Sequence, residues 1–529
     1  MSALRGTAPL VRLILARDRL RLSAWVGGLV LLVIVSAIST KDIYSTQADL
    51  DRVAALSRDN PAALAFNGPD QALDTMGGQI AFQIGAFTLT MVGLMSVLLV
   101  GRATRGEEDS GRLELVRSMP VGRHAPLAAG LLVCAVASVV LGVLTAASLL
   151  AEDLPAHGSI VFGASFTAVA LVFLGITAVT AQVAENPRVA AGIAGGVLGA
   201  SYIVRAVGDV GNGAVSWLSP IGWAQKARPY AGEQWWPLLL CLVLGVGGVA
   251  LAVVLADRRD FGAGMMAPKA GPAVAGPSLR SPLGLAVRLH RGAVLWWAFG
   301  VLVTAVTYGS LTSAIDDFVA DNPEMLDLVA SLGGASLTDS YLATSLLVLA
   351  LLSAGPALQV LARLHAEESG LRAEPILATR TSRQAWMGSH LVVALGGSGL
   401  SMLLGGIGLG VAYALVGGDA GEVTRLGLAS LGYLPAIWLL AGLALALFGL
   451  LPRWTAGAWV TLTGCLVIGM FGPLLDLPSW VVDLSPFQHT PAVPAVDLRL
   501  LPLAVLSTVT LALVATGFAT FRARDLLTS

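Results

Sequence analysis

Residues 125–150 read APLAAGLLVCAVASVVLGVLTAASLL and contain no charged side chain. A helix of about 20 apolar residues crosses the hydrocarbon core of a bilayer, so this stretch predicts a membrane span. The whole chain has a matching composition, because 56% of its 529 residues are hydrophobic and 12% are charged, about half the charged share of a soluble domain. The sequence therefore predicts an all-α integral membrane protein.

Further apolar runs bring the predicted membrane spans to twelve. They lie at residues 22–39, 80–100, 125–150, 159–182, 189–207, 235–256, 293–313, 342–362, 386–416, 426–450, 454–472 and 500–520. If both chain ends lie in the cytoplasm, the cytoplasmic segments carry 24 lysines and arginines and the outer segments carry 8. This bias follows the positive-inside rule and predicts an N-in, C-in orientation.

Two other readings of the charge pattern are less favoured. The basic N-terminus followed by an apolar run resembles a secretory signal, but a second basic segment precedes the seventh span, where no signal can act. The formal net charge of −1 argues against a nucleic-acid partner, because nucleic-acid-binding domains carry a basic surplus.

Four short motifs of the first half recur in the second half, in the same order and at nearly constant spacing. The pairs are Asp59-Asn60-Pro61 with Asp321-Asn322-Pro323, Glu107-Glu108 with Glu367-Glu368, Pro187-Arg188 with Pro452-Arg453, and Leu218-Ser219-Pro220 with Leu484-Ser485-Pro486. Two halves that each start inside and cross six times form parallel repeats. We expect a first half at 1–259, a flexible cytoplasmic linker rich in proline and glycine at 260–281, and a second half at 282–529.

A charged loop between spans 2 and 3 recurs between spans 8 and 9. Residues 111–117 predict a short surface helix that ends before Pro120. Solvated positive-inside charge explains the arginines of these loops but not the recurring glutamates, so we favour a docking surface for a protein partner. The candidate docking residues are Glu107, Glu108, Arg112, Glu114, Arg117 and Arg123 in the first loop and Glu367, Glu368, Arg372, Glu374 and Arg383 in the second.

The spans carry almost no ionisable groups. Such groups are costly at membrane depth and are kept where ions or protons are coupled to transport. Only His390, near the start of the ninth span, and Arg205, near the outer end of the fifth, approach such positions. We read His390 as an interfacial or bundle-facing imidazole rather than a proton relay. The alternative of a proton-driven secondary transporter of the major-facilitator kind is therefore less favoured.

The sequence also lacks the nucleotide-binding and metal-ligand motifs of the enzyme classes considered. A phosphate-binding P-loop ends in Gly-Lys-Ser or Gly-Lys-Thr, and none of Lys41, Lys226 and Lys269 follows a glycine. The cysteines lie inside spans and the histidines are scattered, so we expect no metal site, no catalytic residues and no cofactor in this chain. A membrane-embedded transferase is a further, weaker alternative.

At its charged loops the sequence resembles the membrane subunits of type-2 ABC exporters. The fused twelve-span form is similar to the permeases of polyketide-antibiotic exporters, the tetronasin-resistance type. The resemblance rests on Glu-Glu and Ser-Gly-Arg-Leu-Glu at 107–114, on the basic helices before spans 1 and 7, and on the two Leu-Ser-Pro segments. The second loop departs from the pattern, with Pro375 where Leu115 stands and Arg380 where Pro120 stands.

The resemblance implies an export permease of the bacterial plasma membrane that moves hydrophobic or amphipathic compounds. It implies two copies of a separately encoded ATPase, which bind ATP and Mg²⁺, with the charged loops seated in them as coupling helices and with amphipathic elbow helices before spans 1 and 7. Spans 2, 5, 8 and 11 would line the path, although their side chains are also suited to ordinary packing or lipid contact. The candidate path residues are Phe82, Gln83, Phe87, Thr88, Met91, Tyr202, Arg205, Tyr341, Gln359, Met470 and Phe471.

Overall fold

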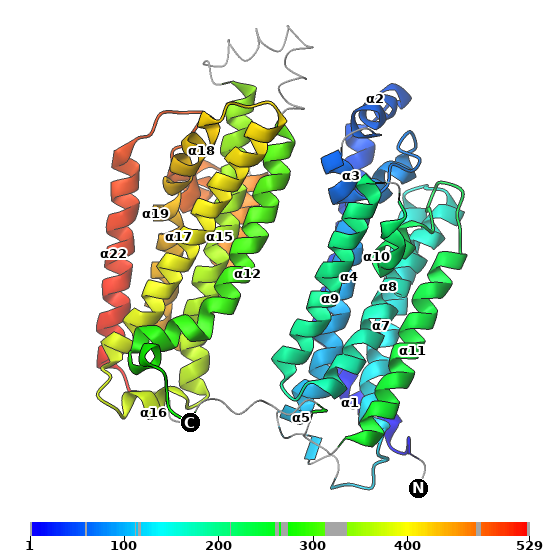
Figure 1. Ribbon diagram of the computed structural model, residues 1–529, viewed down its shortest axis with the longest axis horizontal. Coiled ribbons are helices and arrows are strands. Elements are labelled where there is room, and N and C mark those ends of the chain that lie inside the picture. The colour runs from blue at the N-terminus through cyan, green and yellow to red at the C-terminus, as the bar shows by residue number, and fades with distance from the viewer. Residues whose placement is uncertain are drawn as a thin grey trace. The chain divides into compact units, whose positions relative to one another are not determined.

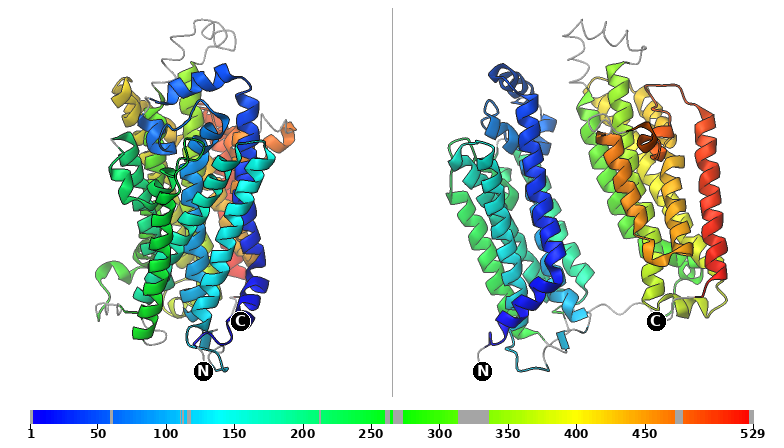
Figure 2. Two further views of the ribbon diagram at one scale, coloured as in Figure 1. Left: turned by 90° about the vertical axis from the view of Figure 1, so that its right-hand side faces the viewer. Right: turned by 180° about the vertical axis from the view of Figure 1, so that it is seen from behind.

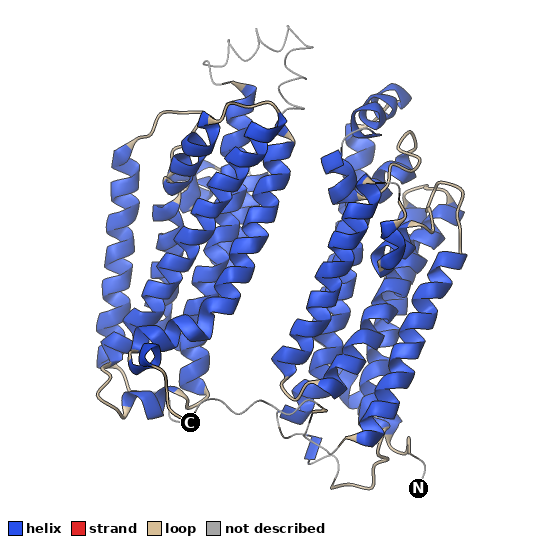
Figure 3. Ribbon diagram, viewed as in Figure 1, coloured by secondary structure: helices blue, strands red, loops and turns tan. Residues whose placement is uncertain are grey.

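The chain divides into two units, Met1–Gly271 and Pro272–Ser529, which are described separately (Figure 1). The division falls within residues 260–281. The computed structural model describes residues 3–58, 61–109, 111, 113–114, 118–211, 213–259, 264–265, 273–312, 336–471 and 478–525. The regular elements of these residues are helices (Figure 3), so the prediction of an all-α protein is confirmed.

Unit 1 contains six long helices and several short ones among its described residues. The long helices are α1 (Thr7–Ile43), α4 (Met76–Gly101), α7 (Ala125–Ala151), α8 (Ala156–Val183), α9 (Pro187–Val210) and α11 (Trp236–Arg258). The short ones are α2 (Gln47–Arg58), α3 (Pro61–Asn67), the π-helical turn η1 (Arg102–Gly106), α5 (Glu107–Asp109), the turn η2 (Val215–Leu218) and α10 (Pro220–Gln225). The N-terminus and α5 lie at one end of the unit, and α2 and α3 lie at the opposite end (Figures 1 and 2).

Unit 2 has a comparable series of helices in its described part. The longer helices are α12 (Pro282–Ser310), α15 (Leu337–Ser369), α17 (Arg383–Val416), α18 (Gly421–Leu431), α19 (Leu434–Leu450), α20 (Gly457–Phe471) and α22 (Leu500–Ala523). The short ones are η3 (Pro277–Arg280), α16 (Ala373–Leu377), η4 (Pro452–Trp454), α21 (Ser479–Val482) and η5 (Pro486–His489). The expected elbow helices are the first turns of α1 and α12, because each basic segment is continuous with the span that follows it.

Eleven helices in the described part of the chain are long and apolar enough to cross a membrane, which makes this a multi-pass membrane protein. Twelve spans were expected. In the run predicted at 454–472 the structure describes α20, whose 15 described residues reach about 22 Å at 1.5 Å per residue, less than the roughly 30 Å of a hydrocarbon core, while residues 472–477 lie outside the described part. The predicted tenth span is divided into α18 and α19 at Gly432 and Tyr433, just before Pro435, which cannot donate a backbone hydrogen bond.

The fourth membrane helix of each unit packs against several others. In unit 1, α8 packs against α4, α7 and α11 and buries Phe162, Phe166 and Phe173. Glycines bring the backbones of α8 and α11 together, since a Cβ on Gly245 would lie 2.6 Å from the Leu171 carbonyl oxygen. In unit 2, α19 and α22 cross in the same way, where a Cβ on Gly517 would lie 2.8 Å from the Leu445 carbonyl oxygen. Close approach through small residues is a common basis of helix packing in membranes.

Candidate functional site

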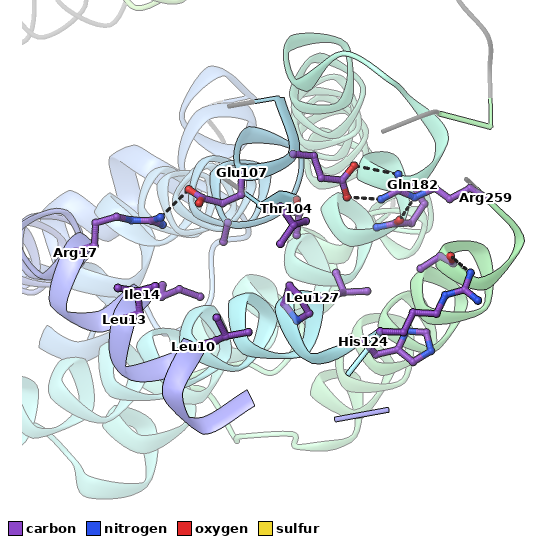
Figure 4. Close-up of a pocket in the computed structure, with 16 residues that line it drawn as sticks. Leu10, Leu13, Ile14, Arg17, Thr104, Glu107, His124, Leu127, Gln182 and Arg259 are labelled. Carbon is purple, nitrogen blue, oxygen red and sulfur yellow. Dashed lines mark hydrogen bonds and ion pairs between the residues drawn. The ribbon is translucent and has the colours of Figure 1, made fainter. Parts of the chain in front are cut away.

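A pocket of about 250 Å³ lies at the end of unit 1 that is predicted to face the cytoplasm (Figure 4). Side chains from α1, η1, α5, the start of α7 and the ends of α8 and α11 line it. Three predicted docking residues, Glu107, Glu108 and Arg123, are among them. The structure therefore brings the two sides of the first charged loop, residues 101–123, to one place.

Glu107 is bound to the N-terminal part of α1. Its carboxylate lies 2.8 Å from Nη1 of Arg17, and Figure 4 shows these two side chains pointing toward one another. The neighbouring Asp18 is buried and accepts hydrogen bonds from Arg17 at 2.7 Å and from Nε of Arg102 at 3.2 Å. These contacts fasten the basic start of α1 to the segment that follows α4.

Replacing Asp18 with asparagine is expected to lower the free energy of unfolding by about 1–3 kcal/mol, because removing one partner from a buried charged cluster leaves the others without compensation. Asp42 on the same helix is exposed, so Asp42→Asn is the matched control and is expected to change little. Thermal unfolding of the purified permease in detergent measures both. Equal midpoints for the two variants would contradict the structural role of Asp18.

Glu108 lies in a second, more buried cluster. Arg259 donates to both of its carboxylate oxygens, at 3.0 and 2.5 Å, and Nη1 of Arg105 donates at 2.7 Å. The same two arginines reach the end of α8: Nε of Arg105 donates to the Ala181 carbonyl and Nε of Arg259 to Oε1 of Gln182, both at 2.6 Å. Carbonyl groups in the last turn of a helix lack helical partners, and the macrodipole there favours cations.

Arg123, on the other side of the first charged loop, also contacts α11. Its Nη2 donates to the carbonyl oxygens of Ala256 and Asp257, at 3.2 and 3.0 Å. Its Nε lies 3.5 Å from the Asp257 carboxylate. Arg123 therefore holds the start of α7 against the last turn of α11.

The second charged loop, residues 363–383, repeats part of these contacts within unit 2. Arg524 donates to both oxygens of Glu368 at 2.7 Å, and Nη1 of Arg383 donates to the Arg524 carbonyl at 2.7 Å. Glu367 is paired with Arg363 and Arg372, both at 3.0 Å. Glu368 thus repeats the structural role of Glu108, whereas Glu367 pairs with arginines of its own loop and Glu107 pairs with Arg17 of α1.

The other candidate docking residues contribute less to these clusters. Glu114 and Glu374 are exposed, Glu374 within the short α16. Leu113 lines the pocket, but most of the helix predicted at 111–117, including Arg112 and Arg117, lies outside the described residues. Its helical form stays a prediction.

Comparison with known proteins places the chain in a family. The model for the family described as multidrug efflux system permease Rv1217c, C-terminal domain, matches residues 9–255 and 279–522. The chain is 39% identical over 528 residues to the multidrug efflux system permease protein Rv1217c of Mycobacterium tuberculosis (strain ATCC 25618 / H37Rv), and the alignment covers 99% of this chain and 96% of that protein. The chain belongs to this multidrug efflux permease family. The expectation of an exporter permease is confirmed at this level, and the matches do not extend to the tetronasin-resistance type.

In this efflux permease the candidate path residues of α4 differ in how far their side chains are buried. Phe82 and Thr88 are buried, Met91 is partly buried, and Phe87 is 45% exposed. Oε1 of Gln83 accepts a hydrogen bond from Thr40 of α1 at 3.2 Å. Of this set Phe87 has the most open side chain, so its face of α4 remains available to lipid or to another surface.

Arg205 and Tyr202 of α9 are held by the segment that precedes α4. Arg205 is fully buried, pairs with Asp209 at 3.3 Å and donates to the Ala65 carbonyl at 2.9 Å. Its guanidinium lies 4.5 Å from the ring centre of Tyr202, whose hydroxyl donates to the Phe66 carbonyl at 2.9 Å. These contacts hold α3 on α9, and they neutralise the charge of Arg205 within the unit.

The candidates in unit 2 also have internal partners where they are described. The Tyr341 hydroxyl donates to the Tyr308 carbonyl at 2.9 Å, and Gln359 accepts from Nε1 of Trp297 at 2.6 Å. His390 is buried with its ring 5.2 Å from that of His290, which agrees with the bundle-facing interpretation. The side chains of Met470 and Phe471 lie outside the described part.

Sequence reasoning missed the arginines that pair with the recurring glutamates. Arg259 and Arg524 end the sixth membrane helix of each half and are 265 residues apart, the same shift that relates Pro187-Arg188 to Pro452-Arg453. This shift could have identified them as a repeated pair. The shift does not predict the partners of these arginines, Glu108 and Glu368, which lie in α5 and α15.

Proposed function

We propose that this multidrug efflux permease is the membrane subunit of a type-2 ABC exporter, a transport subunit without enzymatic activity of its own. It expels hydrophobic or amphipathic drug-like compounds between its two halves. Two copies of a separate ATPase, which bind ATP and Mg²⁺, dock on residues 101–123 and 363–383 and supply the energy.

The observation that carries the proposal is the pair of equivalent charged loops. Each is fixed at its base by buried ion pairs, Glu108 with Arg259 in unit 1 and Glu368 with Arg524 in unit 2, while Glu114 and Glu374 remain exposed to a partner. A fixed base with exposed charges suits a surface that must carry force from another protein. The relative from Mycobacterium tuberculosis is itself named a multidrug efflux permease, which supports drugs as the substrate class.

The proposal is tested with the purified chain and with its complex with the cognate ATPase in liposomes. We expect no ATP hydrolysis by the chain alone and ATP-dependent drug transport by the complex, with or without a proton gradient. Transport that needs a proton gradient and no ATP would establish the secondary-transporter alternative. ATP hydrolysis by the chain alone, or failure to bind any ATPase, would overturn the proposal.

Reversing the charge of an exposed loop residue is expected to uncouple the two activities. Glu114→Arg should reduce the drug moved per ATP hydrolysed about tenfold, because like charges at an interface repel, while the amount of permease in the membrane stays unchanged. Arg112→Glu should act in the same direction. Asp42→Arg, at an exposed acidic residue of unit 1 outside the charged loops, is the control. Full coupling in the two loop variants would remove these residues from the docking surface.

A further inference from the structure

Each charged loop is tied on both of its sides to the last turn of the sixth membrane helix of its unit. In unit 1, Glu108 in the first part of the loop binds Arg259, while Arg123 at its end donates to the carbonyl groups of Ala256 and Asp257. The chain itself connects this loop only to α4 and α7. The ion pair and the hydrogen bonds add α11 as a third attachment.

Unit 2 repeats the arrangement with different surroundings. Glu368 binds Arg524 through two hydrogen bonds, and Arg383 donates to the carbonyl groups of Phe521 and Arg524. The Arg524 guanidinium also lies 5.1 Å from the ring centres of both Phe448 and Phe521. Because the same attachment occurs twice with different neighbours, chance packing is a poor explanation for it.

The arginine in each unit passes the end of the fourth membrane helix, α8 or α19, to reach its glutamate. α8 packs against both α4 and α11, and α19 packs against both α15 and α22. Arg259 contacts Gln182 at the end of α8, and Arg524 contacts the Phe448 carbonyl near the end of α19. The glutamate–arginine pair therefore joins two helices that lie on either side of a third.

These pairs are shielded from water, unlike ordinary surface ion pairs. The exposed fractions are 9% and 11% for the Arg259 and Glu108 side chains, and 18% and 2% for Arg524 and Glu368. Exposed pairs contribute little and are screened by salt. Buried pairs with two hydrogen bonds have a defined geometry, so they can transmit a displacement rather than yield to it.

We propose that Arg259 and Arg524 are positioning residues that link the docking loops to the sixth helices. Together with Glu108 and Glu368 they form the two loop clasps, Glu108–Arg259 and Glu368–Arg524. When an ATPase displaces a loop, its clasp makes the second, third and sixth helices of that unit move together. This role rests on the proposed function, since it needs an ATPase that docks on the loops.

The sharper test uses a double-mutant cycle on the clasp of unit 2. The variants are Glu368→Gln, Arg524→Gln and the double substitution, each in the purified permease–ATPase complex in liposomes. We expect each single change to lower the drug moved per ATP hydrolysed about tenfold, a typical size for coupling between sites, and the double change to lower it no further. A purely structural role would reduce the amount of complex and both rates together, and would leave this ratio unchanged.

Neighbouring arginines provide matched controls. Arg522 and Arg258 are exposed residues of the same helix ends, so Arg522→Gln and Arg258→Gln should leave the ratio intact. Arg259→Gln should lower it in unit 1. Arg524→Lys keeps the charge but cannot form two parallel hydrogen bonds, and its ratio should lie between wild type and Arg524→Gln. The proposal would be overturned if the drug moved per ATP hydrolysed fell in the double variant by the product of the two single losses. It would also be overturned if this ratio were unchanged in both single variants.

A measurement on the permease alone separates this inference from the proposed function. Hydrogen–deuterium exchange of the last turns of α22 should rise in Glu368→Gln and stay unchanged in Arg522→Gln, whether or not an ATPase exists. If the wild-type chain binds no ATPase, the proposed function fails although the exchange result stands. If the wild-type complex is coupled and Glu368→Gln exchanges like wild type, the clasp itself is refuted.

Discussion

Replacing Arg205 with methionine is expected to lower the free energy of unfolding by about 3–5 kcal/mol, the cost of removing one partner from a buried ion pair. Arg205 and Asp209 are 0% and 5% exposed at their side chains, so the remaining carboxylate would be left nearly buried with Ser216 as a partner and without its cation. Methionine has a similar length but cannot donate to Asp209 or to the Ala65 carbonyl. The result should be a less stable unit 1 with α3 released from α9, measured by thermal and denaturant unfolding in detergent.

A second substitution and a surface control make this result specific. Arg205→Met combined with Asp209→Leu should recover part of the loss, because replacing both buried charges by apolar groups is often close to neutral. The Arg52 side chain is 75% exposed, and Arg52→Met should cost little, as expected for a surface charge. If Arg205→Met is as stable as Arg52→Met, the buried pair does not hold this end of the unit together.

Replacing Gly245 with leucine is the other change with a large expected effect. A Cβ there would lie 2.6 Å from the carbonyl oxygen of Leu171 in the facing backbone of α8, so α8 and α11 would have to separate. We expect a loss of about 3 kcal/mol in the free energy of unfolding, at the upper end for overpacking. Drug efflux by cells should fall with the amount of folded permease.

Gly247 on the same helix provides the control for Gly245. A Cβ at Gly247 meets no atom within 4 Å, and leucine has a higher helix propensity than glycine. Gly247→Leu should therefore match the wild type or exceed it in thermal stability. Similar losses in the two variants would show that the α8–α11 crossing tolerates a side chain and that glycine is not required there.

Local sequence features were sufficient for the fold class but not for every span. Apolar runs such as 125–150 specify helices directly, since a buried backbone in a bilayer must satisfy its hydrogen bonds within the helix. The run at 454–472 is also free of charged side chains, yet the described part of its helix, α20, begins only at Gly457 and has 15 residues.

The sequence named residues of the candidate site but not their contacts. The repeated motif identified Glu108 and Glu368, and we expected them to face a partner protein. In the structure Glu108 is bound to Arg259, 151 residues further along the chain, because α8 brings the ends of α4 and α11 near one another. The surroundings of Arg205 also could not be predicted from the sequence. In the structure α3 covers this charge, which hydropathy alone would place in contact with solvent or lipid.

The sequence by itself determined that this protein is a multi-span helical membrane protein with a repeated charged loop in each half. Those properties depend on the order of residues, namely the length of apolar runs, the side on which arginines gather and the recurrence of short motifs. Only the tertiary structure decided which charges are paired within each unit and which, such as Glu114 and Glu374, remain exposed. Ion-pair partners depend on distance in space, and that distance is set by the glycine-mediated packing of helices that lie far apart in the chain.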